Sequence, residues 1–152
     1  MSKRSINTGS GLYTDMYEIA MAQAYFKHGN YNAPACFDYF FRKLPYEGGY
    51  VIFCGLGELL PIIENLHFHK EEIDWLFKEG FDKRFLEWLE AFRFKGSIRS
   101  MQEGEIAFPL DPLLQVEGSL AEVQLIETLL LNYLNFQSLI ATKAARIRYV
   151  AG

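Results

Sequence analysis

The feature that most constrains the fold is a long helical pattern of apolar residues from Leu120 to Val150. An unbroken helix of that span would be roughly 45 Å long, and apolar residues lie around most of its circumference. Its longest stretch without charge, from Thr128 to Thr142, contains two asparagines, a glutamine and a serine. That stretch is shorter than the roughly 20 mostly apolar residues that a membrane span needs. The pattern therefore predicts a long buried helix and no membrane anchor.

Such a helix needs more covering surface than the short segments before it provide. The chain has 152 residues, of which 50% are hydrophobic and 22% charged, as in one folded domain and unlike a disordered chain. We therefore expect either pairing with a second copy or a larger protein whose further residues cover the helix. The alternative is a compact monomer that buries the helix by itself.

The net charge and the cysteines restrict which kinds of protein this chain can belong to. A net charge of −4 disfavours a dedicated nucleic-acid binder, which needs a clustered positive surface. The basic residues Lys143, Arg146 and Arg148 are typical of a helix end that complements the dipole, and less often of an anion site. Cys36 and Cys54 lie among apolar residues without CxxC spacing and are expected to be buried free thiols. With no apolar signal segment at the N-terminus, this usage indicates a cytoplasmic protein.

The first half of the chain predicts a helix followed by a strand. Asp15 and Glu18 have capping-box spacing, and Gly29 with Asn30 ends the helix. The strand begins near Pro34. On its faces Phe37, Tyr39 and Phe41 alternate with Asp38, Phe40 and Arg42.

A turn at 46–49 leads to a helical pattern over 51–66 that Pro61 should kink or break. Two amphipathic helices follow, at 70–80 and 82–92. Their expected inward residues are Ile73, Leu76 and Phe77 in the first, and Phe85, Trp88, Leu89 and Phe92 in the second. The segment 95–119 reads as short strands and turns, with Pro109 and Pro112 at an edge or bulge. We expect one α+β domain over 1–152, with 1–11 a loose tail.

A complete active site is not visible in the motifs. Gly55 and Gly57 are only a fragment of a phosphate-binding loop. His67 and His69 share a strand face and suggest a metal, but no ligand stands at a recognised spacing, so solvated histidines are the preferred interpretation. His28 is interpreted as a partner of the helix dipole.

Four ordered blocks change this interpretation. They are Leu12 to Phe26, Phe37 to Pro45 with Gly48-Gly49, Pro112 to Gly118 running into Gln124 to Thr128, and Asn135 to Ile147. Together they resemble nicotinate phosphoribosyltransferases, and the last block is also weakly similar to the quinolinate enzyme. The resemblance implies a type II phosphoribosyltransferase that joins nicotinic acid to phosphoribosyl pyrophosphate. Mg²⁺ and ATP hydrolysis through a phosphorylated histidine belong to the complete enzyme.

In that family an N-terminal α+β domain precedes an irregular α/β barrel that holds most catalytic groups. The chain resembles only the N-terminal domain and the first long helix. We therefore expect no catalytic residue, no metal ligand and no bound cofactor in it, and no activity of the chain alone. Its partner would be a second copy in a homodimer or the barrel portion.

The resemblance implies two substrate-binding residues. Tyr17 matches the aromatic residue that stacks on the pyridine ring in the neighbouring subunit's active site; the alternative is ordinary packing of the first helix. Arg42 matches an arginine that, in the related nicotinamide enzyme, contacts the nucleotide phosphate across the dimer; the alternative is a salt bridge to Asp38 or another acid.

Weaker candidates are Asp15, Lys143 and Arg146. Capping of the first helix is a sufficient explanation for Asp15, and a position near the end of the last helix is a sufficient explanation for Lys143 and Arg146. Two rival functions stay open. One is a non-catalytic binding or scaffold module with the same domain. The other is a phosphoribosyltransferase that uses quinolinate or nicotinamide.

Overall fold

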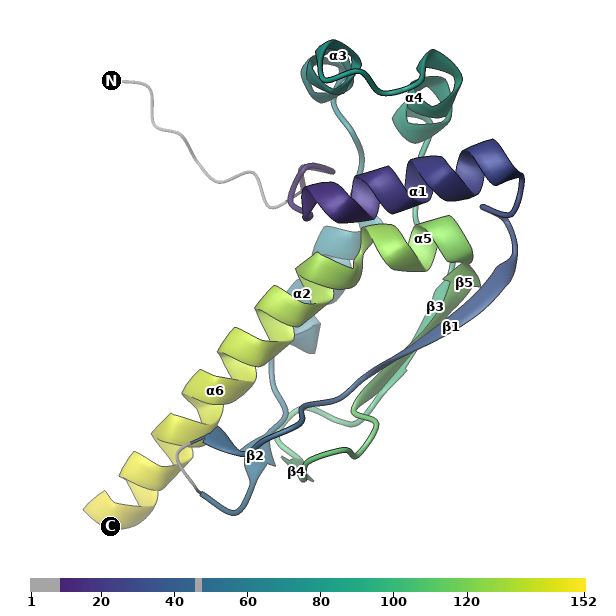
Figure 1. The fold of residues 1–152 in the computed structure, drawn as a ribbon. Coiled ribbons are helices and arrows are strands. Elements are labelled where there is room, and N and C mark those ends of the chain that lie inside the picture. Colours follow the sequence, from purple (N-terminus) through teal and green to yellow (C-terminus); the bar gives the residue numbers. More distant parts are fainter. Residues whose placement is uncertain (1–8, 46–47) are drawn as a thin grey trace, which may run out of the picture.

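The computed structural model describes residues 9–45 and 48–152, and shows helices packed around two small antiparallel sheets (Figure 1). The helices are α1 (Met16–His28), α2 (Leu56–Glu64), α3 (Lys70–Lys78), α4 (Lys83–Glu90), α5 (Leu120–Leu125) and α6 (Glu127–Ala151). The strands are β1 (Pro34–Tyr39), β2 (Val51–Ile52), β3 (Ser97–Ser100), β4 (Ile106–Ala107) and β5 (Leu114–Ser119). The predicted α+β class is confirmed, and the described residues form no closed barrel.

The larger sheet has the strand order β1-β5-β3, and the smaller one pairs β2 with β4. Every pairing within these two sheets is antiparallel, with Phe37 opposite Val116 and Tyr39 opposite Leu114. The strand-rich character predicted for 95–119 is confirmed. Pro109 and Pro112 lie in the connection between β4 and β5, where neither removes a hydrogen bond from a sheet.

The predicted alternation along β1 is confirmed. Tyr39 is buried and Phe37 packs against the core, whereas Asp38 is exposed. Cys36 is also exposed, so the expectation of two buried thiols is wrong for it. Strand geometry is the reason, because Cys36 shares the outward face with Asp38. Cys54 is half-buried, and both thiols are free.

The core gathers aromatic side chains between α1 and α4. Ring centroids of neighbouring pairs among Phe26, Tyr31, Phe85 and Trp88 lie 5.1 to 6.0 Å apart. The inward face predicted for 82–92 is therefore confirmed. In α3, by contrast, Phe77 is 59% exposed and its predicted burial is wrong, because α3 packs mainly on α4 and buries only a narrow stripe through Leu76.

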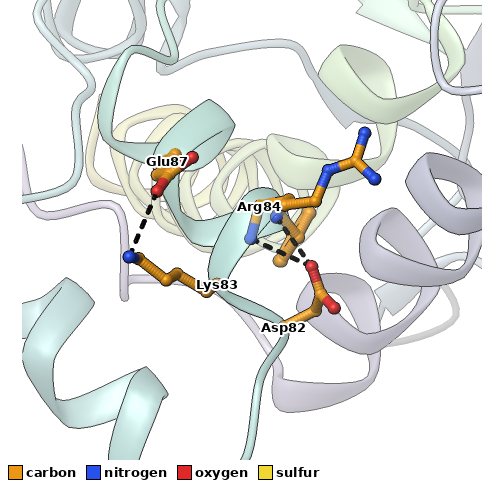
Figure 2. Close-up of polar contacts among 5 residues, drawn as sticks. Asp82, Lys83, Arg84 and Glu87 are labelled. Carbon is orange, nitrogen blue, oxygen red and sulfur yellow. Dashed lines mark hydrogen bonds and ion pairs between the residues drawn. The ribbon is translucent and has the colours of Figure 1, made fainter.

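Helix α4 begins with a local cap that shows why the chain turns helical there. One carboxylate oxygen of Asp82 accepts hydrogen bonds from the amides of Arg84 at 3.0 Å and Phe85 at 3.2 Å (Figure 2). These amides have no acceptor within the helix. An exposed ion pair, Lys83 to Glu87 at 3.9 Å, adds little.

The pattern at 51–66 is only partly helical. Val51 and Ile52 form β2, and Gly55, with φ of 110°, precedes α2. Pro61 lies inside α2 without ending it. The turn expected at 46–49 falls partly outside the described residues, since 46 and 47 are among those left out. The expected tail, 1–11, does so as well, but Gly11 is buried and its amide donates to the His67 carbonyl at 2.8 Å.

The predicted helix from Leu120 to Val150 is interrupted, which corrects the expectation of one element. A single turn residue, Ile126 (φ −100°, ψ −2°), separates α5 from α6. Helix α5 lies beside α1, while α6 runs off at an angle along β2 (Figure 1). Helix α6 buries one face only, which carries Leu129, Leu130, Leu134, Ser138 and Thr142. No helix in the described ranges is long and apolar enough to cross a membrane.

Candidate functional site

Tyr17 lies in the first turn of α1 with about half of its surface exposed, at 49%. Its hydroxyl donates to Oε1 of Glu18 at 3.3 Å and lies 3.5 Å from Oε1 of Glu127, the first residue of α6. Partial desolvation and the carboxylates of Glu127 and Glu18 raise the pKa of Tyr17 to about 12. The phenol therefore stays protonated at neutral pH, and its ring is available at the surface.

Glu18 is fully buried beside it, and the predicted capping box is wrong. Its carboxyl group does not accept from the backbone amide of the N-cap residue Asp15, as a capping box requires. Instead it accepts hydrogen bonds from the Thr128 amide at 3.0 Å, the Thr128 hydroxyl at 2.7 Å and the Thr14 hydroxyl. Burial raises the pKa of Glu18, and the hydrogen bonds from Thr14 and Thr128 oppose that rise. The carboxyl group thus joins the first turn of α1 to the first turn of α6.

Asp15 occupies the N-cap position of α1 by its backbone alone. Its side chain is exposed and makes no capping hydrogen bond. Capping was a sufficient explanation of this residue from the sequence. That explanation is wrong, so Asp15 is left as an exposed carboxylate two residues before Tyr17.

Arg42 follows the end of β1 and is exposed. The alternative of a salt bridge to Asp38 is not seen in the part of the chain that the structure describes, where the Asp38 carboxylate accepts from Gln115 Nε2 at 2.9 Å. The backbone next to Arg42 is held, because the Leu110 amide donates to the Phe41 carbonyl at 2.9 Å. Arg42 is thus an accessible guanidinium on a fixed backbone.

The two basic candidates on α6 differ. Lys143 is exposed. The guanidinium of Arg146 lies 5.6 Å from the centroid of the Tyr50 ring and 3.4 Å from the Tyr50 carbonyl oxygen. It also lies against Gly48, where a Cβ atom would come within 1.4 Å of it. Arg146 therefore binds the segment before β2, and Arg148 is the basic residue in the last turn.

Tyr17 and Arg42 are both placed along α6 but at different points. Tyr17 is beside Glu127, whereas the strand that leads to Arg42 contacts α6 through the Tyr39 hydroxyl, which donates to Asn135 Oδ1 at 2.9 Å. No contact joins the two side chains among the described residues. They are two separate exposed points of the domain.

The pair of histidines for which the sequence suggested a metal lies between α2 and α3. His67 and His69 pack edge to face with ring centroids 4.2 Å apart, and His67 Nδ1 lies 2.7 Å from the Asn65 carbonyl oxygen. Within residues 9–45 and 48–152, no group of three or more His, Cys, Asp or Glu side chains could hold a metal ion.

The sequence interpretation missed the hydrogen bonds from Thr128 to Glu18. The sequence did contain a signal of its burial: Glu18 lies four residues before Ala22 and beside Ile19, on the apolar face of α1. A carboxyl group on the apolar face of a helix needs a hydrogen-bonding partner from elsewhere in the fold.

Comparison with known proteins agrees with this arrangement. Residues 12–135 match the family model of the nicotinate phosphoribosyltransferase (NAPRTase) N-terminal domain. A nicotinate phosphoribosyltransferase of Bacillus subtilis is 46% identical over 142 residues, and one of Caenorhabditis elegans is 44% identical over 145. Both alignments cover 93% of this chain. The chain spans only 29% and 26% of those two proteins, respectively.

Solved structures give the same answer. The crystal structure of human nicotinic acid phosphoribosyltransferase superposes with a TM-score of 0.85 at 36% identity, over 91% of this chain and 29% of that one. The structure of a nicotinate-nucleotide pyrophosphorylase from Pyrococcus furiosus shares the fold. It superposes with a TM-score of 0.61 at 21% identity, over 88% of this chain and 28% of that one. On the family match and these relatives, the chain belongs to the nicotinate phosphoribosyltransferase N-terminal domain family.

Proposed function

We propose that this chain is the N-terminal domain of an enzyme that joins nicotinic acid to phosphoribosyl pyrophosphate, giving nicotinate mononucleotide and pyrophosphate in NAD biosynthesis. The family match over 12–135 carries the proposal, and Tyr17, inside the matched region, has an accessible ring. Mg²⁺ and ATP hydrolysis are proposed for the complete enzyme. Within residues 9–45 and 48–152, no group of three or more His, Cys, Asp or Glu side chains could hold a metal ion, and no step in this chain is assigned to Mg²⁺ or ATP.

Tyr17 is proposed to bind the pyridine ring by stacking. In the reaction the ring nitrogen attacks C1′ of the ribose as pyrophosphate departs, so the ring must be held flat and correctly oriented. An aromatic face is suited to that, because offset stacking fixes a plane without consuming the nitrogen lone pair. The carboxyl groups of Glu18 and Glu127 hold the hydroxyl end of Tyr17 and leave its ring half-exposed.

Arg42 is proposed to bind a phosphate of the substrate or product. A guanidinium donates two parallel hydrogen bonds to phosphate oxygens, which fixes both distance and orientation. Its exposure and the absence of an ion pair to Asp38 support this role, since a guanidinium already paired within the domain would be less available. Asp15 and Lys143, both exposed, stay as weaker candidates.

The outer face of α6 supports the proposal that further polypeptide covers it, either a second copy in a homodimer or the barrel portion. Large apolar side chains along α6 are exposed: Phe136 (61%), Ile140 (46%), Ile147 (61%), Tyr149 (88%) and Val150 (85%). Large apolar side chains left exposed along one helix favour an interface. A cytoplasmic location is proposed from the two free thiols, because cysteines stay unpaired in a reducing compartment.

The test compares the 152-residue chain with the complete enzyme. We expect the chain alone to form no nicotinate mononucleotide, and the complete enzyme to prefer nicotinate when it is titrated with nicotinate, nicotinamide and quinolinate. Tyr17→Ala in the complete enzyme should weaken nicotinate binding by about 1–3 kcal/mol, as expected for one stacked ring. Product formation by the isolated chain, or an unchanged KM for nicotinate in Tyr17→Ala, would contradict the proposal.

A further inference from the structure

The residue next to Tyr17 is a carboxyl group in a place where carboxyl groups are rare. Glu18 is fully buried, with 0% of its surface exposed, on the face of α1 that packs into the core. Burying a charged group costs several kcal/mol unless hydrogen bonds replace the lost water. The chain therefore keeps Glu18 in this place only because several donors surround it.

Those donors come from both helices that meet there. Thr14 lies just before α1 and Tyr17 in its first turn, whereas Thr128 belongs to the first turn of α6 and donates through both its amide and its hydroxyl. The first amides of a helix have no acceptor within it. The carboxyl group of Glu18 thus caps α6 from a different helix, directly after the interruption at Ile126.

The placement of Tyr17 depends on this junction. No ring-to-ring contact involves Tyr17 among the described residues, and the hydroxyl is its anchored end. Its two acceptors are Glu18, which ties α1 to α6, and Glu127, which is itself part of α6. The direction in which the ring points is therefore set by how α1 sits on α6.

We propose that Glu18 is a positioning residue for substrate binding: by joining the first turns of α1 and α6, it holds the Tyr17 ring in the orientation that stacks on the pyridine. The inference rests on the proposed function, because it needs Tyr17 to bind the pyridine ring. Glu18 does not itself touch the substrate, so its effect on binding passes through Tyr17.

A double-mutant cycle in the complete enzyme tests this. The variants are Glu18→Ala, Tyr17→Ala and the two together, and the readouts are kcat and the KM values for nicotinate and phosphoribosyl pyrophosphate. Residues that act as a unit couple by about 0.5–3 kcal/mol, so Glu18→Ala should raise the nicotinate KM roughly tenfold when Tyr17 is present. In the Tyr17→Ala background the same change should alter it by less than about twofold. The KM for phosphoribosyl pyrophosphate should stay unchanged.

Two further variants separate positioning from a loss of stability. Glu72→Ala is the matched control, because the Glu72 carboxylate likewise accepts from a helix-start amide, that of His69 at 2.8 Å. It should lower the melting temperature and leave the nicotinate KM unchanged. Glu18→Gln keeps an oxygen that accepts from Thr128 and should restore a near-normal nicotinate KM. If Glu18→Ala does not fold, Thr128→Val, which removes one donor, replaces it in the cycle with a smaller expected rise.

The outcomes distinguish the two levels of the proposal. If Tyr17→Ala raises the nicotinate KM but the effect of Glu18→Ala simply adds to it, the positioning role is overturned and the proposed function stands. If Tyr17→Ala leaves that KM unchanged, the stacking role fails and the inference fails with it. A Glu18→Gln variant as weak as Glu18→Ala would also overturn the inference, because hydrogen-bond geometry would then not be what matters.

Discussion

Thr142→Val tests how α6 holds strand β2. Thr142 is fully buried; its hydroxyl accepts from the Ile52 amide at 2.9 Å and donates to the Ser138 carbonyl at 2.6 Å. One turn earlier, the Ser138 hydroxyl accepts from the Cys54 amide and donates to the Cys54 carbonyl, both at 3.1 Å. Strand β4 pairs with only one edge of β2. At the other edge, the hydroxyls of Thr142 and Ser138 make the hydrogen bonds that a neighbouring strand would otherwise make.

Valine has nearly the shape of threonine, so the substitution removes the hydroxyl and creates almost no cavity. The Ile52 amide then loses its acceptor, and an unpaired buried donor costs about 1–3 kcal/mol. We expect the free energy of unfolding to fall by about that amount. Thr142→Ser is the matched control: it keeps the hydroxyl and loses one methyl group, worth about 0.8 kcal/mol.

Urea denaturation of the chain measures the loss. With a slope of about 1–3 kcal/mol per molar, a change of this size lowers the midpoint by roughly 1 M and leaves the slope unchanged. Amide hydrogen exchange makes the test specific, since the Ile52 amide should lose protection in Thr142→Val and keep it in Thr142→Ser. Wild-type stability together with a protected Ile52 amide in Thr142→Val would refute this account of the junction.

Three other predictions concern binding, pH and packing. Arg42→Ala in the complete enzyme should raise the KM for phosphoribosyl pyrophosphate, and Arg42→Lys should restore it poorly, because lysine cannot donate two parallel hydrogen bonds; equal KM values in all three proteins would contradict the phosphate role. Burial raises the pKa of Glu18 above its usual 4.5, so the folded state binds this proton more tightly than the unfolded state. The resulting contribution to the free energy of unfolding is complete below pH 4.5 and is lost as the pH rises through the pKa that Glu18 has in the folded state. Glu18→Gln does not titrate, so its free energy of unfolding should increase relative to that of the wild type as the pH rises through this range. Equilibrium unfolding at a series of pH values measures this, and a difference between the two proteins that does not change with pH would contradict it. Gly96→Ala should destabilise the chain by about 1–3 kcal/mol in thermal or urea unfolding, since the new Cβ would lie 2.3 Å from the Glu117 carbonyl oxygen; an unchanged midpoint would show that the backbone relaxes freely there.

The elements whose signals are local were predicted well. Asp82 and the spacing of Phe85 and Leu89 specify a helix that begins and faces inward as expected. The alternation of Phe37 and Tyr39 with Asp38 specifies the orientation of β1 in the same way. In both cases the side chains that decide the structure lie within a few residues of one another, so the pattern can be read along the chain.

The failures share the opposite property. The Asp15–Glu18 pair has the spacing of a capping box, yet Glu18 binds Thr128, which lies 110 residues further along the chain. The sequence around Ile126 continues a helical pattern and contains neither glycine nor proline, yet the helix breaks there because α5 packs on α1 while α6 follows β2. A hydrogen-bond partner so far away in the sequence produces no periodic pattern around the residue that it binds.

By itself, the sequence determined the α+β class, the order of most helices and strands, the inward face of β1 and α4, and the family, through four blocks that span most of the chain. Only the tertiary structure decided that Glu18 joins two helices, that Tyr17 keeps an accessible ring and that the hydroxyls of α6 complete the edge of β2. Periodic burial depends on neighbours three or four positions away, so composition and spacing encode it. A buried hydrogen bond depends on two groups that meet only after the chain has folded, so its partner cannot be found before the packing is known.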